Sequence, residues 1–146
     1  MYIGQNICNT ITNEIKRSDS IMSELKRGDI YIVNLPDAKG SIQSKQRPAV
    51  IISNNLANHY SPVLHICPLT SVTSKSKLPT HIMISRNCGL IRDSIALCEQ
   101  TMLVAKDAFL DKIGVCDKET LKRIDQGIAI QFGLIGKENK NNAVYA

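Results

Sequence analysis

Ile30-Tyr31-Ile32-Val33-Asn34-Leu35 and Ala49-Val50-Ile51-Ile52 are the two stretches that decide the fold. The first combines β-branched and aromatic residues, which favour strands. The second is a continuous apolar run, which is typical of a buried strand. Residues 36–46 between them are polar and predict a loop. The sequence therefore predicts a β domain that begins with two strands and the loop joining them.

Further short strands are expected after these two. A turn-rich loop at 54–62 and a polar loop at 71–77 interrupt the apolar runs. The expected strands cover residues 63–69, 80–84, 94–100, 102–105 and 113–116. Many short strands in a chain of this length indicate a small, mostly antiparallel barrel.

The C-terminal part changes to a helical period. Asp117 is a good N-cap residue, and Gly136 is placed to end the helix. Apolar residues between them recur at spacings of three and four, which gives one apolar face. These residues are Leu121, Ile124, Ile128, Phe132 and Ile135. The expected fold class is therefore mostly β with a C-terminal helix.

The 146 residues leave room for one domain. Residues 1–23 carry isoleucines at four-residue intervals among weak helix formers, so we expect an arm that is disordered or helical. Residues 24–136 form the domain, and the polar residues 137–146 are expected to be a flexible tail.

Charge is distributed unevenly along the chain. The net charge is +5 and the pI is near 9.0, which favours a polyanionic partner. From Ala38 to Arg92 there is no Asp or Glu, whereas the stretch holds all three histidines. Its basic residues are Lys39, Lys45, Arg47, Lys75, Lys77, Arg86 and Arg92. We interpret the stretch as a phosphate-binding face; the alternative is charge scattered over a barrel.

Cysteine and histidine spacing argues against a metal site or another cofactor. The five cysteines are odd in number and lack C-x-x-C spacing, so we expect buried, reduced thiols in a cytoplasmic protein. The histidines are too far apart for a local metal motif. No apolar run is long enough for a membrane span or a signal peptide, so no membrane partner is expected.

Arg47 and Thr70 form a pair that strand pairing would bring together. Arg47 precedes Pro48 at the start of one expected strand, and Thr70 ends the strand at 63–69. If these strands pair antiparallel around the loop 54–62, both residues lie at one edge of the sheet. An arginine and a hydroxyl over one phosphate suit RNA cleavage, because the 2′-hydroxyl attacks its own phosphate. On spacing alone, a surface salt-bridge arginine and a turn threonine are the stronger interpretation.

An ordered set of short motifs runs through the chain. Its members are Arg27-Gly28-Asp29-Ile30-Tyr31, Gly40-Ser41, Lys45-Gln46-Arg47-Pro48, Pro68-Leu69-Thr70, Lys77-Leu78-Pro79-Thr80-His81, Arg92-Asp93-Ser94 and Glu99-Gln100. In this order the set resembles the MazF/PemK toxins. The resemblance covers roughly Leu25 to Leu134.

The resemblance implies an SH3-like antiparallel barrel of the CcdB/MazF type that forms a homodimer. It implies the toxin of a type II toxin-antitoxin system, an mRNA interferase that cleaves single-stranded mRNA without a metal by 2′-hydroxyl attack. The implied partners are this RNA and a cognate acidic antitoxin, with operator DNA bound only together with the antitoxin.

Site residues follow from the matched motifs. Arg47 would be the catalytic cation and Thr70 its hydroxyl partner. Lys45, Lys75 and Lys77 are expected to bind RNA as basic residues of the acid-free stretch. Ser41, Gln100 and Asn54, which begins the further matched motif Asn54-x-x-x-Asn58-x-Tyr60-Ser61-Pro62, fall at positions that line the RNA groove in the family. Among them, an amide such as that of Gln100 reads base edges, which phosphate contacts cannot do. Many relatives carry an acid after Gly40-Ser41, where this chain has Ile42, so either the acid is dispensable or the nuclease is weaker.

Two alternatives stay open. The related CcdB toxins share the barrel but bind DNA gyrase through the C-terminal helix without catalysis. A nuclease-weak regulator that binds its own promoter with an antitoxin is the second. The presence of Arg47 and Thr70 argues against the CcdB-like alternative, and incubation with single-stranded RNA in EDTA would separate the remaining classes.

Overall fold

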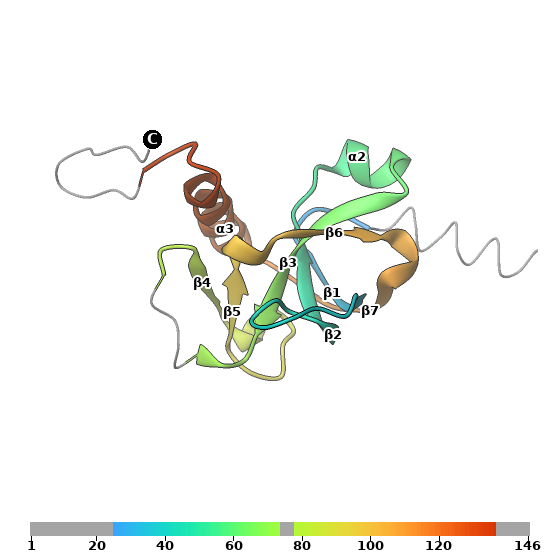
Figure 1. Cartoon of the computed structure of the whole chain (residues 1–146), viewed down its shortest axis with the longest axis horizontal. Coiled ribbons are helices and arrows are strands. Elements are labelled where there is room, and N and C mark those ends of the chain that lie inside the picture. The colour runs from blue at the N-terminus through green and yellow to red at the C-terminus, as the bar shows by residue number, and fades with distance from the viewer. Residues whose placement is uncertain (1–24, 74–77, 137–146) are drawn as a thin grey trace, which may run out of the picture.

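The structure, a computed structural model, describes residues 25–73 and 78–136 (Figure 1). The arm expected at 1–23 and the tail expected at 137–146 therefore lie outside the described residues. Lys75 and Lys77, which we expected to bind RNA, lie outside them as well.

Strands dominate the described chain. They are β1 (Asp29–Leu35), β2 (Lys45–Ile51), β3 (Val63–Thr70), β4 (His81–Ile84), β5 (Ser94–Leu97), β6 (Met102–Ala105) and β7 (Phe109–Val115). The α-helices are α2 (Asn55–Tyr60) and α3 (Lys118–Gln131). Short 3-10 helices are η2 (Arg86–Cys88), η3 (Cys98–Gln100) and η4 (Lys106–Ala108).

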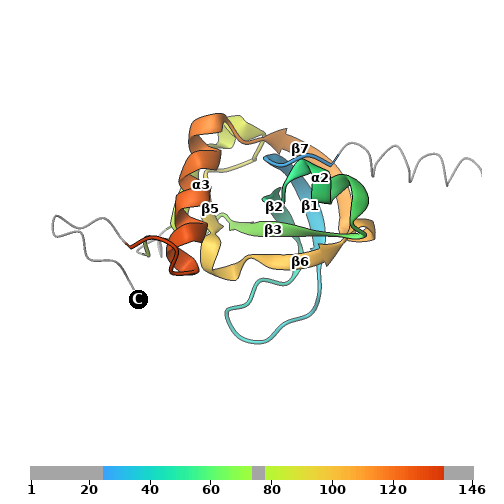
Figure 2. The same cartoon turned by 90° about the horizontal axis from the view of Figure 1, so that it is seen from above.

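The strands form one antiparallel sheet that coils on itself. Its order is β4-β5-β3-β2-β1-β7, and β6 adds to β3. Strand β3 causes the coiling, because successive parts of it pair with β6, β2 and β5. The end strands β4 and β7 are not paired with each other among the described residues, so the barrel is open. Helix α3 packs against β4 and η3, on the opposite side of the strands from α2 (Figures 1 and 2). The predicted mostly β barrel with a C-terminal helix is confirmed.

Two groups of apolar side chains form the core, one on each face of β1. Tyr31 and Val33 pack in the first group, whereas Ile30 packs in the second, together with Ile124 of α3. Successive residues of a strand point to opposite faces, so β1 is buried on both sides. This burial explains why the stretch that starts the fold is almost continuously apolar.

Strands β2 and β7 begin earlier than the apolar pattern predicts. We expected them to start at residues 49 and 113, but they start at Lys45 and Phe109. Both extra segments pair with β1 through the backbone, and their outer side chains are mostly exposed. Backbone pairing needs no apolar side chain, so hydropathy alone underestimates these strands.

Two other expectations are corrected. The loop expected at 54–62 contains helix α2, whose first turn is capped by the Asn54 side chain. The strand expected at 94–100 ends at Leu97, where η3 begins. Both are short local turns without the apolar period that reveals a longer helix.

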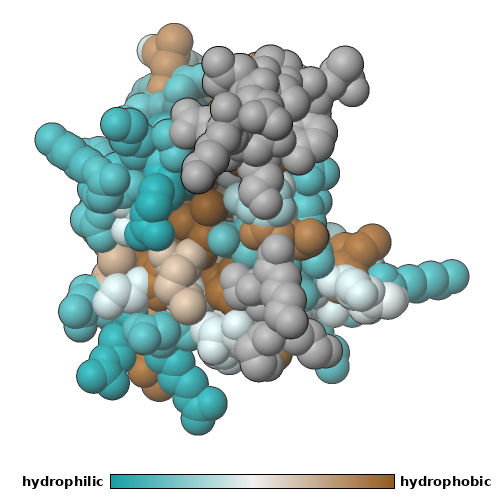
Figure 3. Space-filling view, turned by 90° about the vertical axis from the view of Figure 1, so that its left-hand side faces the viewer, coloured by the Kyte–Doolittle hydropathy of each residue, from teal (hydrophilic) through white to brown (hydrophobic). Residues whose placement is uncertain are grey.

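Helix α3 starts as predicted and ends early. Asp117 caps it, because its Oδ1 accepts from the Thr120 backbone N–H at 2.8 Å. The helix ends at Gln131 and not near Gly136, since Gly133 adopts a left-handed φ of 69°. Phe132 is consequently 65% exposed and not part of the buried face. Figure 3 views the side of the molecule that lies at the left in Figure 1, where α3 ends, and it shows apolar atoms at the surface between hydrophilic regions.

The described cysteines are free, and three of them belong to the core. Cys67, Cys98 and Cys116 are buried and Cys88 is half-buried. The hydrogen bond with Cys98, together with burial, raises the pKa of Cys67, and burial raises the pKa of Cys116 to about 12. Thiols with raised pKa values stay neutral near pH 7, so these side chains pack as small apolar groups, as predicted.

Candidate active site

A groove of two adjoining hollows crosses one edge of the barrel. The larger, of about 810 Å³, lies between the start of β2, the end of β3 and residues 89–92. The smaller, of about 380 Å³, lies between the end of β3, β5 and η3. Gln43, Thr70 and Val72 line both, so the two hollows adjoin, and together they are called the groove.

The wall at residues 89–92 is fixed to β7 by close backbone packing. A Cβ atom on Gly89 would lie 2.1 Å from the Ile113 carbonyl oxygen, and one on Gly114 would lie 1.8 Å from the Cys88 carbonyl oxygen. Only glycines allow two backbones to approach in this way. The wall therefore has a defined position relative to the strands.

Arg47 and Thr70 line the same hollow. Strands β2 and β3 are antiparallel as predicted, and their pairing ends where Ala49 lies opposite Pro68. Arg47 and Thr70 each lie two residues beyond this last pair, where Thr70 pairs with Ile95 of β5. Both side chains are half-buried and line the larger hollow.

Arg47 is held by neutral partners. Its Nε donates to the Ser44 carbonyl oxygen at 3.0 Å, and its Nη1 donates to Oε1 of Gln43. The ion pairs of the described residues are Arg27–Asp125, His81–Glu99 and Lys112–Asp29. The interpretation of Arg47 as a surface salt-bridge partner is therefore wrong within the described chain, and its charge is available to a ligand anion.

Ser41 and Gln100 also meet, across the smaller hollow. Gln100 Nε2 donates to the Ser41 carbonyl oxygen at 2.9 Å, and Gln100 Oε1 accepts from the Gln43 backbone N–H at 2.8 Å. The amide of Gln100 thus ties the loop at residues 36–44 to η3. Gln43 is not among the site residues expected from the sequence, because it lies in none of the matched motifs and only the loop conformation brings it to the groove.

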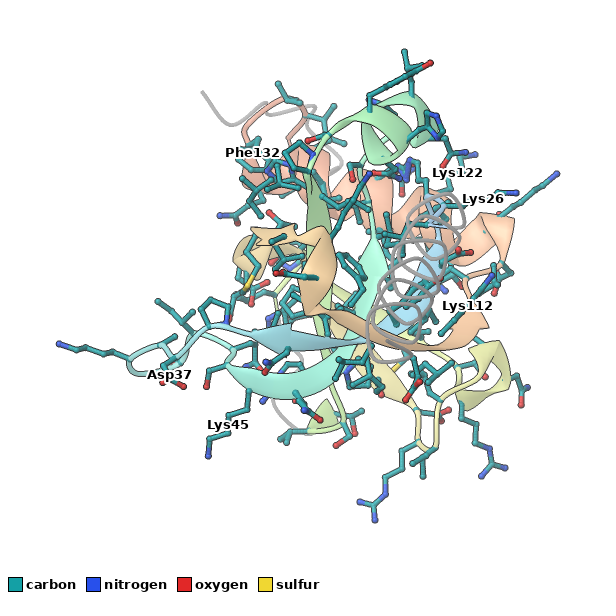
Figure 4. The ribbon with its side chains drawn as sticks, turned by 90° about the vertical axis from the view of Figure 1, so that its right-hand side faces the viewer. Lys26, Asp37, Lys45, Lys112, Lys122 and Phe132 are labelled. Atoms are coloured by element: carbon teal, nitrogen blue, oxygen red, sulfur yellow. The ribbon has the colours of Figure 1, made fainter. Side chains whose placement is uncertain are left out.

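Lys45 and Asn54 line neither hollow. Lys45 is exposed and points away from the body of the molecule (Figure 4), with a left-handed φ of 65°. Asn54 follows the far end of β2 from Arg47, and its side chain accepts from the Ala57 backbone N–H at 2.8 Å to cap α2. The structure therefore gives Asn54 a structural role and leaves Lys45 as a peripheral charge.

A carboxylate closes the smaller hollow. Glu99 Oε1 lies 2.7 Å from Nε2 of His81, and Glu99 Oε2 accepts from the Thr80 hydroxyl at 3.1 Å. Ile42 stands where the resemblance leads us to expect an acid, but it is exposed and lines neither hollow. This end of the groove therefore carries a carboxylate acceptor, whereas the other end carries the Arg47 guanidinium.

Two further features concern the described residues alone. Their His, Cys, Asp and Glu side chains form no group of three or more that is suited to hold a metal ion. None of their helices has the length and apolar character that crossing a membrane requires.

The fold and the groove define a class of small open-barrel proteins with an arginine at one edge that has no carboxylate partner among the described residues. A family model described as a PemK-like, MazF-like toxin of type II toxin-antitoxin systems matches residues 26–132. Endoribonuclease EndoA of Bacillus subtilis (strain 168) is 37% identical over 112 residues, which cover 76% of this chain and 97% of that protein. The chain therefore belongs to the PemK-like, MazF-like toxin family.

Solved structures share the fold. MazF from Deinococcus radiodurans superposes with a TM-score of 0.64 at 16% identity, covering 74% of this chain and 96% of that one. An endoribonuclease from Mycobacterial species, solved with its cognate antitoxin, gives a TM-score of 0.63 at 21% identity. That match covers 77% of this chain and 98% of the other.

Proposed function

We propose that this chain is an endoribonuclease toxin that cleaves single-stranded mRNA at preferred sequences without a metal. The observation that carries the proposal is Arg47, which has no carboxylate partner among the described residues and lines the larger hollow together with Thr70. Family membership and the 37% identical endoribonuclease support it.

The chemistry needs no outside nucleophile. The 2′-hydroxyl of the substrate loses its proton to water and its oxygen forms a bond to the adjacent phosphorus, while the bond from phosphorus to the 5′-oxygen breaks and that oxygen takes a proton from water. Negative charge grows on the non-bridging oxygens, and the Arg47 guanidinium neutralises it with its fork of donors. The Thr70 hydroxyl donates to the same phosphate and fixes its orientation. The products are a 2′,3′-cyclic phosphate and a 5′-hydroxyl.

Sequence preference arises in the smaller hollow. It combines apolar walls from Leu78 and Leu97 with the Glu99 carboxylate and the Gln100 amide. Apolar walls take a base face, and polar groups take hydrogen bonds from its edge. Ser41 lies at the same hollow and completes its polar side.

Cleavage in EDTA tests the proposal. Purified protein should cut mixed single-stranded RNA at preferred sites with EDTA present, and the upstream fragments should end in a cyclic or 3′-phosphate. Loss of activity in EDTA with recovery in magnesium would contradict the mechanism. A CcdB-like gyrase-binding toxin or a nuclease-weak regulator would leave the RNA intact.

The proposed assembly is a homodimer, in which RNA spans two grooves. Apolar side chains exposed after α3 support self-association, since Phe132 is 65% and Leu134 73% exposed. Light scattering should give a dimer at micromolar concentration, and a monomer alone would contradict the assembly.

The proposed inhibitor is an acidic antitoxin, and the proposed compartment is the cytoplasm, where mRNA is present. The groove offers Arg47 and Arg92 to carboxylates and exposed Val72 and Ile91 to apolar anchors. Operator DNA is bound only by the toxin and antitoxin together.

Expression of the chain alone should arrest growth, and co-expression of the neighbouring reading frame should relieve it. Harmless overexpression of soluble protein would contradict this scheme.

A further inference from the structure

Gln43 connects Arg47 to the opposite side of the groove. Its backbone N–H donates to Gln100 Oε1 at 2.8 Å, and its side-chain Oε1 accepts from Arg47 Nη1. Gln100 in turn donates to the Ser41 carbonyl oxygen at 2.9 Å. The loop at residues 36–44 is therefore held between η3 and Arg47, with Gln43 at the centre.

An amide oxygen suits an arginine that acts on phosphate. A carboxylate in the same place would hold the guanidinium but would also cancel its charge. The amide of Gln43 accepts one N–H and leaves the charge intact, and the Ser44 carbonyl adds a second neutral acceptor at 3.0 Å. The remaining guanidinium donors, for which the described residues provide no acceptor, are left for a ligand.

We propose that Gln43 is the positioning residue of Arg47, which sets the guanidinium against the scissile phosphate without neutralising it. This proposal rests on the proposed function, because it requires Arg47 to act on RNA. Gln43 does not touch the reacting atoms and acts through Arg47. Gln100 gains a second role, since it anchors the backbone of Gln43.

Gln43→Met removes the acceptor and keeps the side-chain length and the backbone N–H that bonds Gln100. The single-turnover cleavage rate at saturating RNA should fall about tenfold, because the arginine loses its fixed orientation. Affinity for an RNA with a 2′-deoxy nucleotide at the cleavage site should change by less than about twofold. The matched control is Gln46→Met, on an exposed residue of β2 that lines neither hollow. Equal rates for the two variants would overturn the proposal.

Gln43→Glu tests whether the acceptor beside Arg47 must be neutral as well as present. It keeps an acceptor beside Arg47 and adds a negative charge, so the rate should fall at least as far as in Gln43→Met. A wild-type rate would overturn the claim that the acceptor must be neutral. Combining Gln43→Met with Arg47→Ala should cost no more than Arg47→Ala alone, since one residue acts through the other. Additive losses would overturn the positioning role.

These variants distinguish the two proposals. If Arg47→Ala cleaves at the wild-type rate, the proposed function fails and this inference fails with it. If Arg47→Ala is slow while Gln43→Met matches Gln46→Met, only the positioning role fails. Equal melting temperatures for the variants show that the rate differences are not caused by unfolding.

Discussion

Arg47 and Arg27 lie at different edges of the same barrel and have opposite surroundings. The Arg27 guanidinium pairs with the Asp125 carboxylate of α3, so it joins the start of β1 to the helix. Among the described residues, the Arg47 guanidinium meets only the Gln43 amide and the Ser44 carbonyl. The charge of Arg27 is paired within the protein, whereas the charge of Arg47 remains available to an anion. The partner's chemistry, and not the residue type, decides which arginine is available to RNA.

Arg47→Ala should have the largest effect on cleavage. The single-turnover rate should fall by about a hundredfold or more, because charge on the phosphate builds in the transition state. Arg47→Lys should restore little, since a point charge cannot reproduce the guanidinium fork. The melting temperature should stay near the wild-type value, because Arg47 has no described ion pair to lose. Near-normal cleavage by Arg47→Ala would remove the distinction between the two arginines.

Arg27→Ala should show the reverse pattern. Its ion pair is partly exposed, with side-chain exposures of 27% and 48%, so its loss should cost about 1 kcal/mol or less. The melting temperature should drop by a few degrees, while the cleavage rate stays at the wild-type value. Thermal unfolding measured beside cleavage checks both parts. Slow cleavage at an unchanged melting temperature would show that Arg27 serves the site.

Lys45→Ala should have a smaller effect, limited to binding. Lys45 points into solvent beside the groove, so it meets phosphate as a screened charge. Its loss should reduce the salt dependence of RNA affinity by a slope of about 0.7 or less, the value for one phosphate contact on a single strand. Lys122→Ala, on α3, is the control and should leave the slope unchanged (Figure 4). A slow cleavage rate in Lys45→Ala would make this lysine part of the chemistry.

Asp117→Asn should have the smallest effect and none on cleavage. The backbone N–H of Thr120 lowers the pKa of Asp117 below its ordinary value of 3.8. A lowered pKa contributes stability that is present above pH 3.8 and lost as the pH falls through the folded-state pKa. Asparagine still caps the helix but does not titrate in this range. Melting temperatures measured from about pH 6 to pH 3 should therefore fall more steeply for the wild type, and parallel curves would contradict this.

The sequence predicted those parts of the fold that depend on local pattern. Apolar runs gave β1 and the buried half of β2, and the period of three and four gave α3 with its Asp117 cap. The first residues of β2 and β7 were not predicted to be strand, because their conformation depends on pairing with β1 and not on side-chain polarity.

The candidate site was predictable where it depends on register. Arg47 and Thr70 follow from one antiparallel pair, so their positions could be inferred from two strand ends. Gln43 depends on the path of the loop at 36–44, which turns at Gly40 with a φ of 64° and at Lys45 with a φ of 65°. The polarity of a segment predicts that it is a loop but does not determine the path of its backbone. Motif order also could not show that Asn54 caps α2 outside the groove.

The ratio of lost rate to lost affinity in Arg47→Ala tests the central claim most directly. The rate is measured in single turnover at saturating RNA, and affinity is measured on the 2′-deoxy analogue that cannot be cleaved, with Lys45→Ala as the comparison. We expect a rate loss of about a hundredfold or more in Arg47→Ala with a much smaller loss of affinity, and a normal saturated rate in Lys45→Ala. If both variants lose affinity equally and both cleave at the normal rate once saturated, Arg47 belongs only to a basic surface and the account is wrong.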